Sequence, residues 1–381
     1  MKRLCLAIVI MVVFSVSTGC ANDDEATTVD MDANTVMSND YKVWFVTEKG
    51  GLYTRESIWD GDVQVEKDIA ISKIIDDGSG ICSLSSPNRF SDFVFAIKAD
   101  GTLWQLVEDS GQYRLDRIDG IEGCMKACTG DGHVMALTRD GSVYAWGDNK
   151  YGQLGDGTTR SRERPQKVKR LPGVVDISSG RDHCMALGSD GNVYTWGCNF
   201  QGQIGDGTYA NEVEGSGRSS VYKVESLSGI MQISAGAAWC VALREDGLVY
   251  EWGSRATANF MCRPSPTRVN LPEGIVQISA YGLRALALSS SGELWNWGGI
   301  LAIPTEGMEL PRRIADLPEG SKIIAGWNDI VITGDNEVWQ GFTARINEIE
   351  SYPYYSGKFV CIFSKEDVEN YGIKIDGEIP E

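Results

Sequence analysis

The sequence predicts an all-β fold in which small antiparallel sheets close into a ring. A twelve-residue phrase recurs along the chain, as ALTRDGSVYAWG at 136–147, ALGSDGNVYTWG at 186–197 and ALREDGLVYEWG at 242–253. Each copy places Asp-Gly between two runs rich in Val, Leu, Tyr and Trp, which is the pattern of a β-hairpin. The runs are apolar at nearly every position, as expected for strands covered on both faces. A ring of small sheets, each packed between two neighbours, provides that burial.

Weaker copies of the hairpin lie at 45–53, 96–104, 287–298 and 331–339, so seven copies span most of the chain. Their turn residues recur 40 to 56 positions apart, a period typical of propellers and solenoids. No 3.6-residue apolar period supports a helical solenoid. Another strand-like run precedes several hairpins, at 174–180, 230–236 and 323–326, and predicts a third strand in each sheet.

The two ends of the repeat array predict how the ring closes. The chain enters the array at a hairpin, 41–53, and leaves it with 358–364, which resembles the strand that precedes a hairpin. We therefore expect the two ends to complete one shared blade. Segment 372–379 resembles a truncated eighth hairpin, and it leaves a different closure or an eight-bladed ring open.

A second phrase follows two of the hairpins, as WGDNKYGQLGDGT at 146–158 and WGCNFQGQIGDGT at 196–208. A Gly-x-x-His element precedes the same hairpins, at Gly130 with His133 and at Gly180 with His183. In this combination the chain resembles the regulator of chromosome condensation repeats, loosely from about Tyr41 to the C-terminus. The resemblance implies a seven-bladed β-propeller. The Gly-His and Trp-Asp pair of WD repeats and the paired glycines of kelch repeats are missing.

The first forty residues predict export and a membrane anchor. Residues 1–19 combine Lys2 and Arg3 with a short apolar run, 4–14, and are interpreted as a signal peptide. Ser-Thr-Gly-Cys at 17–20 resembles a bacterial lipobox, which predicts lipidation of Cys20; ordinary secretion is the alternative. Segment 20–40 then forms a flexible acidic tether, and the propeller occupies 41–381. We expect an exported protein, lipid-anchored at the cell membrane and facing outward.

The charge of the chain bears on its partners. The sequence has 35 Lys and Arg against 53 Asp and Glu, a formal net charge of −18. Nucleic-acid binding depends on neutralising phosphates, so we expect no nucleic-acid partner. The eukaryotic namesake of the resembling family binds chromatin and promotes nucleotide exchange on a small GTPase. Export and acidity argue against both activities here, and leave an unknown extracytoplasmic protein as the expected partner.

Ten cysteines in an exported chain raise the question of disulfides. Cys124 and Cys128 are four apart on a presumed strand, about 13 Å, which exceeds disulfide reach. Cys184 and Cys240 occupy the same slot of consecutive units and are expected to be small core residues. A single bridge stays open among four further cysteines, namely Cys82, Cys198, Cys262 and Cys361. No paired Cys-x-x-Cys or histidine cluster predicts zinc.

No motif predicts catalysis or a cofactor. The only two histidines occupy the Gly-x-x-His slot and are interpreted as buried structural residues. No Gly-x-Ser-x-Gly marks a nucleophile, the Asp-rich turns lack calcium-loop spacing, and the glycines do not open helices as phosphate loops require. We therefore expect no catalytic, metal or cofactor site.

The loops before the hairpins are expected to ring one face of the disc and to bind partners. The candidate partner-binding residues are Asp131, Arg181, Asp182, Trp239, Tyr281, Arg284, Trp327 and Asn328. Segment 209–227 is interpreted as an inserted loop, either a partner contact or tolerated slack.

The hypothesis is a non-catalytic, surface-anchored platform for protein–protein interaction. Some exported bacterial members of the resembling family act as β-lactamase inhibitory proteins, which makes inhibition of an extracellular enzyme a narrower hypothesis. A carbohydrate or cell-wall binding module, with Trp and Tyr stacking on sugars, is the alternative, and an enzyme is the third class.

Overall fold

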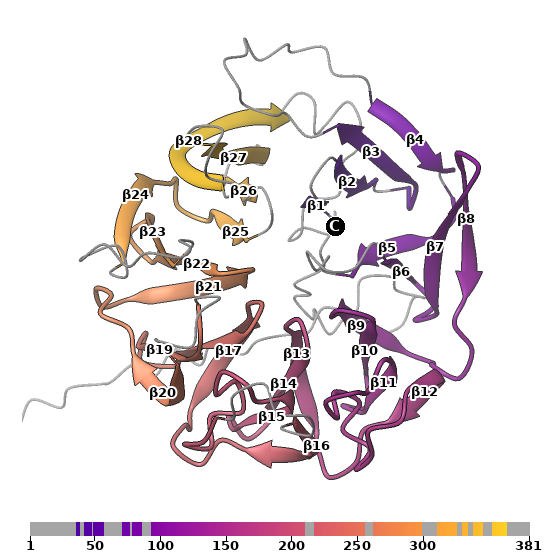
Figure 1. Cartoon of the computed structure of the whole chain (residues 1–381). Coiled ribbons are helices and arrows are strands. Elements are labelled where there is room, and N and C mark those ends of the chain that lie inside the picture. Colours follow the sequence, from indigo (N-terminus) through magenta and orange to yellow (C-terminus); the bar gives the residue numbers. More distant parts are fainter. Residues whose placement is uncertain are drawn as a thin grey trace, which may run out of the picture.

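Seven four-stranded antiparallel sheets are arranged as blades around a central axis (Figure 1). They are seen in a computed structural model that describes residues 36–38, 42–47, 49–56, 71–76, 78–85, 93–209, 217–255, 262–298, 311–325, 330–333, 338–345 and 353–363. Within these ranges there is no helix, and hence none long and apolar enough to cross a membrane. The all-β, seven-bladed prediction is confirmed.

Each blade consists of four strands that are consecutive in the chain. The first strands lie nearest the axis (Figure 1): β1 Val36–Ser38, β5 Ile81–Leu84, β9 Cys124–Thr129, β13 Val174–Ser179, β17 Ile230–Ala235, β21 Ile275–Tyr281 and β25 Lys322–Ile324. The second strands are β2 Lys42–Val46, β6 Val94–Lys98, β10 His133–Thr138, β14 His183–Gly188, β18 Trp239–Arg244, β22 Arg284–Ser289 and β26 Ile330–Ile332. The third strands are β3 Leu52–Glu56, β7 Leu103–Asp109, β11 Val143–Gly147, β15 Val193–Cys198, β19 Val249–Gly253, β23 Glu293–Gly298 and β27 Val338–Arg345. The fourth strands, at the outer rim, are β4 Ile71–Ile75, β8 Gln112–Arg117, β12 Arg162–Lys167, β16 Gly217–Lys223, β20 Arg263–Arg268, β24 Arg312–Asp316 and β28 Pro353–Phe363.

Most outer strands were not expected, because their sequences lack an apolar run; the exception is β28, which overlaps the strand predicted at 358–364. β12 reads RERPQK, and β20 reads RPSPTR, since one edge of each faces no further strand of its sheet. The predicted insertion at 209–227 is corrected by the same fact: 217–223 forms β16, which pairs with β15. The strands predicted before the hairpins are confirmed as β13, β17 and β25.

Ring closure also differs from the expectation of a shared blade. β28 pairs with β27 as the fourth strand of the last blade, whereas β1 to β4 form the first blade from one continuous part of the chain. Val36–Ser38, placed in the tether by sequence, is β1 and pairs with β2. Cys20, the signal segment 1–19 and the eighth-hairpin candidate 372–379 lie outside the described residues.

The core consists of layers between adjacent blades, and alternate residues of one strand serve opposite layers. In β10, Met135 and Leu137 pack toward the next blade, in a cluster that includes Trp196, whereas Val134 and Ala136 pack toward the preceding blade. All four side chains are buried. The strands are therefore covered on both faces, which explains why their sequences do not alternate.

Side chains of the inner strands form hydrogen bonds to the backbone of the adjacent blade. Ser178 Oγ accepts from the backbone N–H of Ala235 at 2.9 Å, and Ser234 Oγ accepts from Ala280 at 2.8 Å. The amide of Gln232 likewise accepts from the N–H of Ile278 at 2.8 Å. These bonds satisfy backbone donors that face a neighbouring sheet instead of a strand of their own.

Candidate functional site

Two sets of loops share one face of the ring. In an antiparallel four-stranded blade, the connection between the first and second strands lies on the same side as that between the third and fourth. Bonds between the two sets confirm this: Asp148 N donates to Gly132 O at 2.8 Å, and Cys198 N donates to Asp182 O at 2.8 Å. We call this side the loop face. The Asp-Gly turns lie on the opposite side.

Backbone hydrogen bonds join the first-to-second loops of successive blades around the axis. Asp131 N donates to Arg181 O at 2.7 Å, Arg181 N to Ala237 O at 2.9 Å, and Ala237 N to Gly282 O at 2.6 Å. The bonds involve main-chain atoms only, so they place no demand on the side chains. Four blades thus hold their loops in fixed relative positions.

The Gly-x-x-His slot anchors each of these loops from below. A Cβ on Gly130 would lie 1.9 Å from His133 Cε1, and one on Gly180 would lie 2.0 Å from His183 Cε1. The imidazole therefore folds back onto its glycine, which requires the missing side chain. Both histidines are fully buried. Burial lowers the pKa of His133 to about 4 and that of His183 to about 3, so both rings are neutral.

The thiols beside these rings are equally inert. Cys184 Sγ lies 3.2 Å from His133 Nε2, and Cys240 Sγ lies 3.2 Å from His183 Nε2. Burial raises the pKa of both thiols well above the usual value, and therefore neither supplies a thiolate. Their prediction as core residues is confirmed.

The described cysteines are all free. Cys124 and Cys128 lie on one strand, β9, in accord with their expected separation, and Cys82, Cys198 and Cys262 also form no disulfide. The side chain of Cys361 lies outside the described residues.

The second repeated phrase forms a loop that closes over the next blade. Asn149 Oδ1 accepts from the N–H of Leu154 at 2.9 Å and so shapes the turn. The loop then presents the carbonyl of Gln153 to the indole of Trp196 in the following blade, at 2.9 Å. Gln203 O and Trp252 Nε1 repeat this contact at 2.9 Å.

The next junction lacks this phrase and uses a different acceptor. Trp297 Nε1 donates to Glu251 Oε2 at 3.0 Å, and the Glu251 carboxylate also faces Arg255 at 3.2 Å and Arg263 at 3.0 Å. Glu251 is only 5% exposed. A side-chain carboxylate held by two guanidinium groups thus takes the place of the loop carbonyl.

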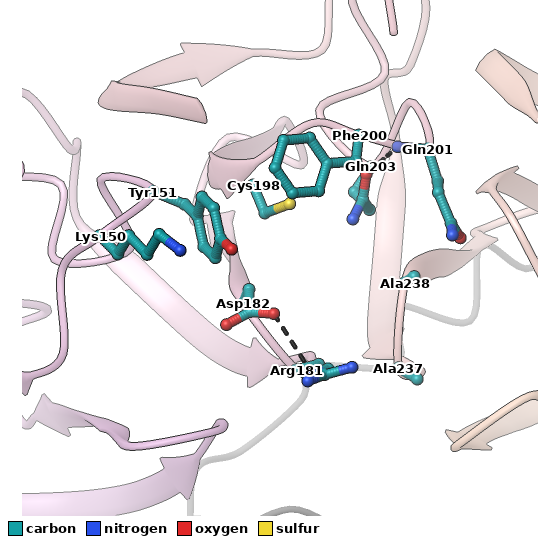
Figure 2. Close-up of a pocket in the computed structure, with 10 residues that line it drawn as sticks. All are labelled: Lys150, Tyr151, Arg181, Asp182, Cys198, Phe200, Gln201, Gln203, Ala237 and Ala238. Atoms are coloured by element: carbon teal, nitrogen blue, oxygen red, sulfur yellow. Dashed lines mark hydrogen bonds and ion pairs between the residues drawn. The ribbon is translucent and has the colours of Figure 1, made fainter. Parts of the chain in front are cut away.

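A pocket of about 600 Å³ opens on the loop face where three blades meet (Figure 2). The long loops of the third and fourth blades contribute Lys150, Tyr151 and Phe200, while the loops nearer the axis contribute Arg181 and Asp182. The Tyr151 and Phe200 rings meet edge to face, with centroids 5.1 Å apart. The pocket therefore combines aromatic surface with both signs of charge.

The charges in the pocket are coupled to one another. Arg181 Nε lies 3.1 Å from Asp131 and 3.5 Å from Asp182. Burial raises the pKa of Asp182 to about 6, opposed by the Arg181 guanidinium and reinforced by the carboxylates of Asp131 and Asp148. The charge of the Asp182 carboxyl therefore changes around pH 6.

The candidate residues differ in their accessibility. Arg181 and Asp182 line the pocket, and Asp131 forms an ion pair with Arg181. Tyr281 is half-buried at the end of β21. Trp239 is 1% exposed and donates to Gly282 O at 2.9 Å, and Arg284 is 9% exposed, so neither is open to direct contact. Both occupy the histidine slot, which explains their burial. Trp327 and Asn328 lie outside the described residues.

The sequence did not single out three residues of the pocket, Lys150, Tyr151 and Phe200. They lie inside the phrase between Trp-Gly-x-Asn and Gly-Gln, at positions that vary between its two copies: Lys-Tyr at 150–151 and Phe-Gln at 200–201. Variation of this kind within a fixed frame is a signal that could have marked the loop as a contact surface.

The described residues contain no group of three His, Cys, Asp or Glu side chains placed to hold a metal ion. The pocket has no histidine, and burial raises the pKa of its single thiol, Cys198, to about 11. Its polar groups can hold a partner through hydrogen bonds and ion pairs, but they do not form a nucleophile with an adjacent base.

Comparisons with known proteins agree with this architecture. The regulator of chromosome condensation (RCC1) repeat matches residues 140–187 and 190–243, and a second description of that repeat matches 126–153 and 174–203. A 57-residue segment is 46% identical to the human E3 ubiquitin-protein ligase HERC2, covering 14% of this chain and 1% of the ligase. A 45-residue segment is 47% identical to human RCC1 domain-containing protein 1, covering 12% of each protein. The matches thus span small parts of these relatives.

Two solved structures share the fold. Human WBSCR16 superposes with a TM-score of 0.61 at 18% identity, covering 80% of this chain and 86% of the other. Prp20p of Saccharomyces cerevisiae, whose binding to Gsp1p and histones was described with its structure, superposes with a TM-score of 0.57 at 18% identity. That likeness covers 74% of this chain and 76% of Prp20p.

Proposed function

Because the chain belongs to the regulator of chromosome condensation repeat family, we propose that it is a non-catalytic platform that binds another protein on its loop face. The observation that carries the proposal is the pocket shared by three blades, with aromatic and charged side chains on a fixed backbone frame. Aromatic and arginine side chains commonly dominate the energy of protein interfaces. A rigid frame also lowers the entropic cost of binding.

The proposed platform is exported and held at the membrane by a lipid on Cys20, with the loop face free to meet an extracytoplasmic protein. An extracellular enzyme, inhibited by occlusion of its active site, is the narrower form of this proposal. Lipidation is tested separately: metabolic labelling with an alkyne fatty acid should mark the wild type and not Cys20→Ala. Equal labelling of both proteins would contradict the anchor.

The binding proposal is tested by capture of envelope proteins on the full-length chain, followed by mass spectrometry. Lys150 is exposed at the pocket, whereas Arg139 is exposed at an Asp-Gly turn on the opposite side. Lys150→Glu and Arg139→Glu change the net charge equally, so they form a matched pair. A protein lost with Lys150→Glu and retained with Arg139→Glu would support the loop face as the contact surface.

Two outcomes would contradict the proposal. Equal loss of the captured protein with both variants would place the contact elsewhere, and retention of glycan without any protein would favour the carbohydrate-binding class. Photo-crosslinking from a benzoyl-phenylalanine introduced at Phe200 then shows whether the captured protein lies over the pocket.

A further inference from the structure

The third blade carries a dense group of basic residues along its outer rim. Six of the eleven residues in 160–170 are Lys or Arg and only Glu163 is acidic, in a chain whose net charge is −18. They lie on β12 and directly beside it. We call this group the basic strip, and its members are Arg160, Arg162, Arg164, Lys167, Lys169 and Arg170.

The basic strip contains more cations without a counter-charge than the other outer strands, among which Arg268 of β20 and Arg312 of β24 also have no ion pair with a described residue. Arg114 of β8 pairs with Asp116 at 3.0 Å, Arg263 of β20 with Glu251 at 3.0 Å, and Arg313 of β24 with Glu293 at 3.3 Å. Within the strip, only Arg162 has such a partner, Asp156 at 2.9 Å. Its other five members are exposed and form no ion pair with any residue in the part of the chain that the structure describes.

Protection of a sheet edge does not account for this arrangement. Basic residues and proline do blunt edge strands against unwanted pairing, and β12 contains Pro165. However, β20 has the same location and two prolines, and only one of its two arginines, Arg268, lacks an ion pair with the residues that the structure describes. An edge can therefore be blunted with far fewer unpaired cations. Five unpaired cations close together repel one another, which is tolerable in solvent and becomes favourable when an anion arrives.

We propose that the basic strip is the docking site of an acidic peptide segment of a partner protein, which lies along β12. The six residues of β12 span about 20 Å at roughly 3.3 Å per residue, the length of an extended peptide of about six residues. Arginine offers a planar fork that binds carboxylates in a bidentate manner. The outer edge of β12 also carries main-chain groups with no neighbouring strand, to which an extended peptide can add.

The surroundings favour a short acidic segment over a longer or flatter polyanion. The chain as a whole carries a net charge of −18, so a nucleic acid or an anionic membrane that extends beyond the strip meets a repulsive surface. A peptide confined to the strip avoids that repulsion.

The test measures the affinity of the full-length protein for a labelled peptide with five Glu-Ser repeats by fluorescence anisotropy. The buffer contains about 0.15 M salt, close to the physiological ionic strength. A variant with Arg160, Arg164, Lys169 and Arg170 changed to Gln removes four unpaired charges. The control removes four ion-paired charges elsewhere, by changing Arg114, Arg117, Lys223 and Arg313 to Gln. Circular dichroism confirms that both variants are folded.

We expect the strip variant to bind the peptide at least about tenfold more weakly than the wild type, and the control to stay within about twofold. The salt dependence of the affinity should also become less steep for the strip variant, since fewer cations meet the peptide. Equal weakening in both variants would show a diffuse field and overturn the proposal. Tighter binding of a 20-base-pair duplex, or of vesicles rich in phosphatidylglycerol, would overturn it as well. The strip variant keeps Lys150, and the loop-face test changes Lys150 alone, so failure of the strip proposal leaves the loop-face proposal standing.

Discussion

Replacing Gly130 by alanine is expected to destabilise the propeller, and removing the His133 ring should abolish that effect. The φ angle of Gly130 lies outside the left-handed region, so alanine is compatible with the backbone itself. The obstacle is the imidazole, since the new Cβ would lie 1.9, 2.4 and 2.7 Å from three of its ring atoms. All three nearest atoms belong to this single side chain.

The magnitude follows from the packing around the ring. His133 is fully buried in a close-packed layer, with Nε2 at 2.8 Å from Ser179 Oγ, so it has no space into which to retreat. Overpacking of a core typically costs 1–3 kcal/mol, and a contact of this kind is expected at the upper end, about 3 kcal/mol. In a His133→Ala background the obstacle is gone, and Gly130→Ala should change the free energy of unfolding by less than about 1 kcal/mol.

Urea denaturation of the four proteins in the cycle measures the coupling between the two positions. Gly180 is the matched control, because a Cβ there would also lie 2.6 Å from the backbone oxygen of Gly236. His183→Ala should therefore rescue Gly180→Ala only in part. A cost for Gly130→Ala that is the same with and without the His133 ring would refute the reasoning.

Three further predictions concern ionisable side chains. Glu251→Ala should lower the free energy of unfolding by about 3–5 kcal/mol, as expected when one partner of a buried ion pair is removed. Glu251→Gln, which keeps an acceptor for Trp297, should lower it less. Denaturation followed by tryptophan fluorescence compares the two variants, and equal losses would contradict the role of the indole hydrogen bond. The folded-state pKa values of His133 and His183, about 4 and 3, lie below the unfolded value, so the contribution of these rings to stability is complete above about pH 6.5 and is lost as the pH falls. In an Asp182→Asn background, the free energy of unfolding should therefore drop by up to about 4 kcal/mol between pH 7 and 5. A flat profile would contradict the burial of neutral rings. Burial raises the pKa of Asp182 to about 6, so the contribution of its protonated carboxyl to stability is present below about pH 3.8 and is lost as the pH rises through 6. Asp182→Asn should therefore be more stable than the wild type at pH 7.5 and equal to it near pH 3.8. The opposite order would refute the raised pKa of Asp182.

The hairpins and the inner strands could be predicted from the sequence because their signals are local. An Asp-Gly turn such as 140–141 and the apolar runs beside it specify a hairpin without reference to the rest of the chain. The outer strands could not be found in this way. β12 is polar because its outer edge faces no further strand of its sheet, and only its pairing with β11 shows that it is a strand.

The candidate site was predictable only in part. Asp131, Arg181 and Asp182 follow from the position of the first-to-second loops, whereas Lys150 and Phe200 reach the pocket from loops of two different blades. Such a meeting depends on how blades are placed, and no single repeat contains it. Trp239 was expected at the surface although it occupies the histidine slot. Its indole is buried against Gly236, where any side chain would place a Cβ 2.0 Å from the indole nitrogen.

The main-chain bonds between the loops around the axis have a consequence for how this protein can change over generations. Since Asp131, Arg181 and Ala237 donate through their peptide nitrogens, almost any residue other than proline could stand at these positions without loss of the bond. Mutation can therefore explore new side chains at the centre of the loop face while the frame keeps its shape. Specificity for a new target could arise by substitution alone, much as antibody loops diversify on a constant framework.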